Sequence, residues 1–181
     1  ALEVQGNSAA IKLKGENILA TERTGYAGLQ LSNGANVILE NGAAESETIG
    51  SLTATGGAAG AGIGSGIFDS AGDITISGGT VTATGGSCQA GIGSGDNGTV
   101  GDITISGGTV TAKSNSEGAG IGTGRNGTTG DITISGGTVT ATGGNGAAGI
   151  GSGNSSGIGS SKVETITISG GTVTATGGDY G

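Results

Sequence analysis

Apolar and polar residues alternate in short segments along most of the chain. The segments ITIS and TVTAT place isoleucine, valine or alanine at every second position, with threonine or serine between them. This period of two and the many β-branched residues are typical of a half-buried β-strand. A third segment, AGIGSG, has one large apolar residue between glycines and predicts a weaker strand. No helical period is present, so we expect an all-β protein.

The three segments recur at a fixed spacing. Equivalent apolar residues return with a 29-residue period: Ile74, Ile103 and Ile132; Val81, Val110 and Val139; Ile63, Ile92, Ile121 and Ile150. The last unit begins at Ile166, later than this period requires, because the segment before it is longer. Such repeats are typical of solenoids, in which each unit is stabilised by its neighbours. The pattern predicts a right-handed parallel β-solenoid of about six coils, with three short strands per coil.

One continuous domain accounts for the whole chain. Residues 1–72 are interpreted as diverged N-terminal coils and residues 73–181 as the regular repeats. The last unit stops after GGDYG, which indicates a piece of a longer array. We expect identical side chains to stack from coil to coil on the inside: Ile74, Ile76, Val81, Ala83 and Ile92 with their copies.

The N-terminal coil keeps the apolar spacing but loses the glycines. The intervals between Ile11, Ile18 and Leu29 equal those between the apolar residues of a regular unit. On this alignment Ile18 points inward, and Leu19 replaces a threonine of the later units.

Threonine fills the outward positions of the TVTAT strands. The expected ranks contain Thr80, Thr82, Thr84, Thr109, Thr111, Thr138, Thr140, Thr142, Thr172, Thr174 and Thr176. Lys113 interrupts one rank. Threonine is a common polar residue on a solvated strand, where its hydroxyl can bond across strands. Alternatively, the ranks form a flat hydroxyl array that binds polysaccharide or, through T-x-T ranks, ice.

Two further features are candidate sites. The glycines of AGIGSG predict an exposed, side-chain-free strip that could admit a loop, another chain or a flat ligand: Gly62, Gly64, Gly91, Gly93, Gly120, Gly122, Gly149 and Gly151. The alternative is that these glycines only form a tight corner. Oxygen ligands for calcium recur near the loops: Asp69, Asp73, Asp96, Asn97 and Asp102. The alternative for the aspartates is that they accept hydrogen bonds in turns.

Composition narrows the function. The 181 residues include 46 glycines, no histidine and one cysteine, Cys88, and the formal net charge is −8. An acidic chain with few aromatic residues is a poor partner for nucleic acid. No apolar run reaches the roughly 20 residues of a membrane span. Without histidine, acid–base catalysis lacks its commonest group. We therefore expect no enzyme activity, nucleic-acid binding or membrane insertion.

The order YAGLQLSNGANV, GSLTATGGAAGAGIGSG and then repeats of GDITISGGTVTATGG resembles the glycine-rich repeat region of secreted or wall-attached surface proteins of Firmicutes. Such regions are described as carbohydrate-binding-domain-like. The resemblance implies a parallel β-helix similar to the pectate-lyase architecture. It also implies polysaccharide binding, with calcium, outside the cell.

We therefore expect a secreted or cell-surface adhesion module, a rigid stalk that presents threonine ranks and variable loops. Its partner would be a polysaccharide or another host or cell-surface ligand, and it would need no cofactor unless calcium binds. Two alternatives stay open. The chain is a structural spacer or a filament subunit that associates end to end, or it binds ice.

Overall fold

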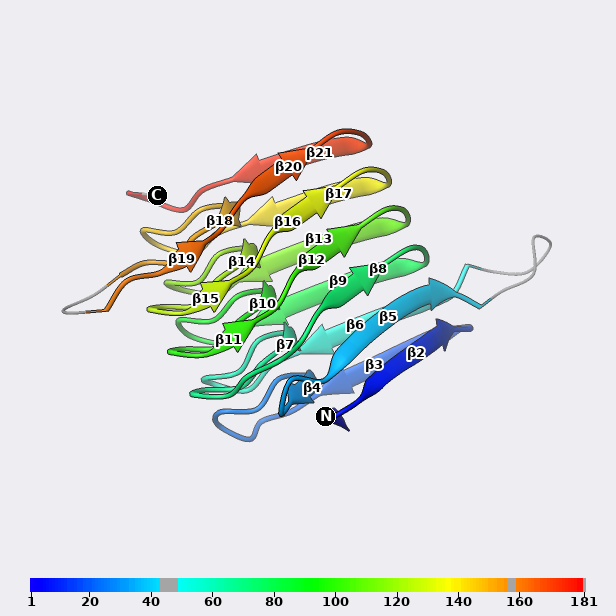
Figure 1. Cartoon of the computed structure of the whole chain (residues 1–181), viewed down its shortest axis with the longest axis horizontal. Coiled ribbons are helices and arrows are strands. Elements are labelled where there is room, and N and C mark those ends of the chain that lie inside the picture. Colours follow the sequence, from blue (N-terminus) through cyan, green and yellow to red (C-terminus); the bar gives the residue numbers. More distant parts are fainter. Residues whose placement is uncertain (43–48, 156–158, 181) are drawn as a thin grey trace.

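The computed structural model describes residues 1–42, 49–155 and 159–180. These residues form 21 strands, which wind through six stacked coils from the N-terminus to the C-terminus (Figure 1). All pairings between named strands are parallel and join a strand to its copy in the next coil, as in the pair of β8 and β12. The prediction of an all-β parallel solenoid with a 29-residue repeat is confirmed. Its handedness stays a prediction.

Three six-stranded sheets form the walls. The glycine sheet contains β1 (Leu2–Gln5), β4 (Leu29–Ser32), β7 (Ile63–Gly64), β10 (Ile92–Gly93), β14 (Ile121–Gly122) and β18 (Ile150–Gly151). The isoleucine sheet contains β2 (Ser8–Leu13), β5 (Asn36–Asn41), β8 (Ile74–Ile76), β12 (Ile103–Ile105), β16 (Ile132–Ile134) and β20 (Ile166–Ile168). The threonine sheet contains β3 (Glu16–Ala20), β6 (Ser51–Thr55), β9 (Thr80–Gly85), β13 (Thr109–Ser114), β17 (Thr138–Thr142) and β21 (Thr172–Thr176).

A fourth, three-stranded sheet was not predicted. It contains β11 (Thr99–Val100), β15 (Thr128–Thr129) and β19 (Lys162–Val163). These strands lie in the variable segment before each ITIS, where two residues are too few to show alternation. Val100 and Thr129 point into the molecule and are buried. The variable loops therefore contribute to the wall of the solenoid as well as to its surface.

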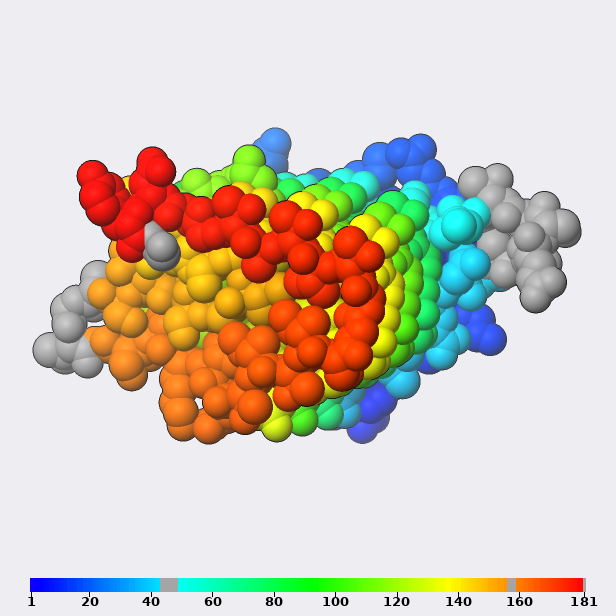
Figure 2. Space-filling model, turned by 90° about the horizontal axis from the view of Figure 1, so that it is seen from above, coloured from blue at the N-terminus to red at the C-terminus, as the bar shows by residue number. Residues whose placement is uncertain are grey.

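The core is a set of apolar columns parallel to the solenoid axis. The predicted inward residues Ile74, Ile76, Val81, Ala83 and Ile92 are all fully buried. In the threonine sheet Val81 pairs with Val110, and Val110 with Val139, so identical side chains pack on one another. Seen along the axis, the coils lie behind one another in sequence order (Figure 2). The inward residues of the last coil are covered from one side only, so Ile166 and Ile168 are 44% and 52% exposed.

The glycine strip is buried, which corrects the prediction that it is exposed. Gly62, Gly64 and their copies in the next three coils are all buried. A Cβ atom on Gly62 would lie 2.6 Å from both the carbonyl oxygen of Gly91 and the amide nitrogen of Thr84. One on Gly64, whose φ is 134°, would collide with the carbonyl of Gly93. Glycine is needed here so that the coils can stack closely.

The alignment of the first coil was wrong by one position in the threonine sheet. Asn17, and not Ile18, pairs with the inward Leu52. Ile18 pairs with the outward Thr53 and is 65% exposed, whereas Leu19 lies in the inward column of Ala54 and packs against the core. Ile18 therefore replaces the threonine, and Leu19 does not. Because Ile18 and Leu19 are adjacent and both apolar, the alternation of apolar and polar residues does not show which of them points inward. A shift of the strand by one residue exchanges its inward and outward faces.

Candidate functional site

In the regular coils the threonine sheet has the longest strands, and its outer face carries a regular set of side chains. Strand pairing sets Thr82, Thr111, Thr140 and Thr174 in one line across four coils. The threonines two positions earlier in each strand form a second line, parallel to the first. The residues two positions later form a third line, in which Lys113 takes the place of a threonine. Adjacent coils are about 4.8 Å apart, and alternate residues of a strand about 6.7 Å apart. The predicted ranks therefore form a nearly rectangular lattice of hydroxyl groups.

These hydroxyl groups are available to an external partner. In the part of the chain that the structure describes, none of the ranked threonines of β9, β13, β17 and β21 makes a side-chain hydrogen bond to another residue. The cross-strand hydroxyl bonds considered from the sequence are thus not formed. Hydroxyl groups elsewhere are engaged: Thr99 donates to Ser70 over 2.9 Å, and Ser77 to the carbonyl of Leu39 over 3.3 Å.

The aspartates at the entrance to ITIS form a ladder between coils. The Oδ1 atom of Asp73 accepts a hydrogen bond from the backbone N–H of Asp102 over 2.9 Å. Asp102 accepts one from Asp131 in the same way, and Asn36 accepts one from Asp73. Each side chain thus fixes the start of the strand in the next coil. This agrees with the turn-accepting alternative.

The calcium candidates do not converge. Asp73 and Asp102 belong to the ladder, and Asp69 accepts hydrogen bonds from Gln30 and Ser32. Asp96 is paired with Arg125, and Asn97 donates to Asp96. No group of three or more acidic, cysteine or histidine side chains suited to a metal occurs within residues 1–42, 49–155 and 159–180. The arrangement therefore gives no support for the calcium site.

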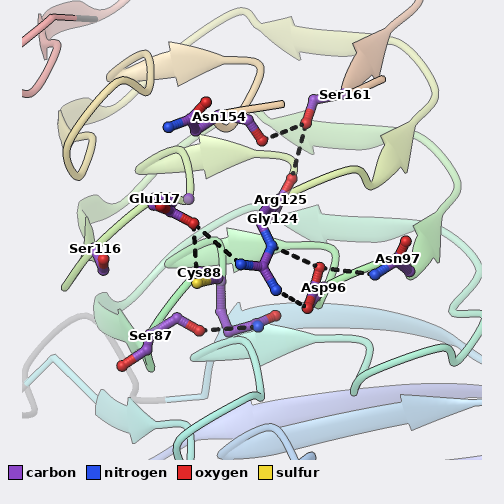
Figure 3. A network of polar contacts seen from close by, with 12 residues as sticks. Ser87, Cys88, Asp96, Asn97, Ser116, Glu117, Gly124, Arg125, Asn154 and Ser161 are labelled. Carbon is purple, nitrogen blue, oxygen red and sulfur yellow. Dashed lines mark hydrogen bonds and ion pairs between the residues drawn. The ribbon is translucent and has the colours of Figure 1, made fainter. Parts of the chain in front are cut away.

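Arg125 is the centre of a polar network between neighbouring loops (Figure 3). Its Nη2 atom lies 2.7 Å from Asp96 Oδ2, and its Nη1 atom 3.4 Å from Glu117 Oε2. The thiol of Cys88 donates to the same oxygen of Glu117 over 3.2 Å. The sequence analysis missed this network. The available signal was the spacing, because Asp96 and Arg125 are one repeat apart, as are Cys88 and Glu117.

The network makes Cys88 a poor nucleophile. Burial and the hydrogen bond to Glu117 raise the pKa of the Cys88 thiol to about 11, so the thiol is protonated near neutral pH. The hydrogen bond to Asp96 raises the pKa of Arg125 as well, which keeps the guanidinium charged. These residues join consecutive coils. A structural role fits them better than catalysis.

The described residues contain no helix of the length and apolarity required to cross a membrane. Four segments of the chain match the family described as Beta helix repeat: residues 74–96, 103–125, 132–154 and 166–181. Each match begins at the first isoleucine of ITIS, and the first three end in the loop after AGIGSG. These four segments are thus similar to beta-helix repeats, in agreement with the stacked parallel strands. No curated protein and no solved structure matches it.

Proposed function

We propose that this chain is a non-catalytic binding module at the cell surface or outside the cell, and that its threonine face binds polysaccharide. The observation that carries the proposal is the lattice of outward hydroxyl groups that have no partner among the described residues. A hydroxyl group both donates and accepts hydrogen bonds, as the hydroxyl groups of a sugar do. A regular protein lattice therefore suits a polymer whose hydroxyl groups also repeat.

Charge and rigidity support the same function. The net charge of −8 disfavours anionic partners such as nucleic acid. The face is held by parallel pairing through six coils, so little conformational entropy is lost when an extended ligand binds. Cys88 and Arg125, whose pKa values are raised, belong to the loop network that joins consecutive coils and not to the threonine ranks. A binding role is therefore favoured over catalysis.

A matched pair of triple variants tests the proposal. Thr82→Val, Thr111→Val and Thr140→Val together remove one central line of hydroxyl groups but keep β-branched side chains. The control replaces Thr75, Thr104 and Thr133, an equivalent line on the isoleucine sheet, in the same way. Binding to insoluble and arrayed polysaccharides would be measured by co-sedimentation and on glycan arrays.

We expect the first variant to lose affinity about tenfold or more, since several hydrogen bonds are lost at once. The control should bind as the parent protein does. Equal binding by all three proteins, or equal losses in both variants, would contradict the proposal. Thermal hysteresis without polysaccharide binding would assign the lattice to ice. Concentration-dependent columns without a ligand would favour the spacer or filament alternative.

A further inference from the structure

A second candidate site lies on the glycine-sheet side of the N-terminal coils. It is a recess of about 320 Å³, lined by Glu3, Tyr26, Gln30, Ile67, Phe68 and Asp69 among other residues. Glu3 and Gln30 are paired neighbours on β1 and β4. The remaining side chains come from two loops, joined where the N–H of Ile67 donates to the carbonyl of Gly25. The volume falls in the range of small-molecule sites.

Phe68 is the least expected residue of this recess. Its side chain is 75% exposed, and its φ is 54°, a backbone conformation that bulky residues rarely adopt. The same position in the next two coils holds Asn97 and Asn126, both with φ of 53°. Asparagine suits this conformation, whereas an exposed phenylalanine gains nothing from it in folding. An outlier of this kind points to a function for the ring.

Asp69 is held in position by its neighbours. Its Oδ2 atom accepts hydrogen bonds of 2.7 Å from both Gln30 and Ser32, and its Oδ1 atom accepts one from the N–H of Ser70. Gln30 is 2% exposed, so this support is buried. In the next two coils the same position is glycine, namely Gly98 and Gly127. The carboxylate is therefore particular to this coil.

The recess is acidic and rich in acceptors. Glu3 and Asp69 supply two carboxylates, and the donors of Gln30 and Ser32 are already directed at Asp69. The nearby guanidinium of Arg23 stacks on the ring of Tyr26, with 4.1 Å between its carbon and the ring centroid. Two carboxylates against one guanidinium leave a net charge of −1. A cation with hydrogen-bond donors or apolar substituents would complement this charge.

We propose that this recess binds an organic ammonium group, with the cation against the Phe68 ring and beside the carboxylates of Asp69 and Glu3. Aromatic rings attract cations through their electron-rich faces, and the attraction is strongest for cations that lose little hydration. Alkylammonium ions meet this condition. The site is separate from the threonine face and does not depend on the function proposed for it.

The test uses tetramethylammonium and choline as probes, and 3,3-dimethylbutanol as the uncharged analogue of choline. Binding to the full chain would be followed by the amide NMR signals of Gly25 and Asp69. We expect saturable shifts with both cations and at least about tenfold weaker binding of the alcohol. Equal binding of cation and alcohol, no saturable shift with either cation, or stronger shifts with neutral sugars would overturn the proposal.

Two variants locate the site. Phe68→Asn restores the residue of the following coils, so the protein should fold and yet bind the cations about tenfold more weakly or worse. Asp69→Asn keeps the size of the side chain but removes its charge and one acceptor oxygen, and should also weaken binding. The triple threonine-to-valine variant of the threonine face should bind the cations as the parent does. Unchanged binding by folded Phe68→Asn would contradict the proposal.

Discussion

The regular coils and the N-terminal coils use the same positions for different purposes. In the glycine sheet, the column that holds Gly93 and Gly122 in the regular coils holds Gln30 in β4. Glycine there allows neighbouring backbones to approach closely. Gln30 instead reaches Asp69 and forms part of a recess. Where the repeat is conserved from coil to coil, its residues allow the coils to stack. Where an N-terminal coil departs from the repeat, the new side chains are free to form other contacts.

The same contrast appears in the loops. Where the regular coils have Asn97 and Gly98, the preceding coil has Phe68 and Asp69. The regular residues suit the backbone, whereas Phe68 does not. A departure that lowers local stability and adds chemically active side chains is a better guide to a binding site than variation alone. Four predictions test this comparison.

The largest loss in the free energy of unfolding should come from replacing a glycine that lies against neighbouring backbone, compared with a glycine in open space. Gly93 and Gly6 both have positive φ, but a Cβ on Gly93 would collide with the Gly122 carbonyl, and one on Gly6 would meet nothing within 4 Å. We expect Gly93→Ala to lower the free energy of unfolding by more than about 4 kcal/mol. Gly6→Ala should cost about 1 kcal/mol. Denaturant unfolding followed by circular dichroism measures both, and similar losses would contradict the close stacking.

Next come the apolar columns. Ile103 is fully buried between its copies, whereas Ile18 is 65% exposed. Ile103→Ala should destabilise the protein by about 3 kcal/mol, because it leaves a cavity between two coils. Ile18→Ala should change the free energy of unfolding by less than about 0.5 kcal/mol. A large loss at Ile18 would restore the alignment that the sequence first suggested.

Exchanging the loop residues should have opposite effects in the two regions. Phe68→Asn should raise the free energy of unfolding by about 1 kcal/mol, since asparagine tolerates this backbone conformation better. Asn97→Phe should lower it by a similar amount. Thermal melts of both variants beside the parent check the pair. Destabilisation by Phe68→Asn would mean that the Phe68 ring contributes to folding.

The smallest effect concerns the thiol of the regular coils. Because the pKa of Cys88 is raised to about 11, its alkylation rate should keep rising with pH beyond 9. An unfolded thiol ionises near 9.0, so this group also makes the folded state less stable as the pH rises from 9 to about 11. Glu117→Gln should lower the pKa, because it removes the carboxylate. A rate that levels off near pH 9 in both proteins would contradict the network.

Much of the fold follows from the sequence, because stacking depends on period alone. The regular spacing predicts the coils, the inward columns and the threonine ranks, including the interruption at Lys113. The first coil was misaligned because Ile18 and Leu19 are adjacent and both apolar. The burial of Gly62 and Gly64 depends on how closely backbones approach, which alternation of polar and apolar residues does not encode.

The recess could not be predicted from spacing. The separation of Tyr26 and Phe68 along the chain is not a multiple of the repeat. The loop that contains Tyr26 and the loop that contains Phe68 are joined by the hydrogen bond from Ile67 to Gly25, which the spacing of the repeat does not predict. The Arg125 network could have been found, since its pairs obey the spacing of the repeat. A site whose residues are one repeat apart, such as the Arg125 network, can be predicted from the sequence. A site formed by residues that depart from the repeat, such as the recess, can be identified only from the structure.

Oxidative cross-linking tests the register of the coils most directly. In a Cys88→Ser background, Thr111→Cys with Thr140→Cys places two cysteines on paired residues of adjacent coils, with their Cα atoms about 4.8 Å apart. This Cα–Cα distance lies within the range for a disulfide. Thr82→Cys with Thr140→Cys places them two coils apart, at about 9.6 Å. We predict rapid cross-linking of the first pair and none of the second under mild oxidation. Rapid cross-linking of the second pair, or none of the first, would contradict the stacked register.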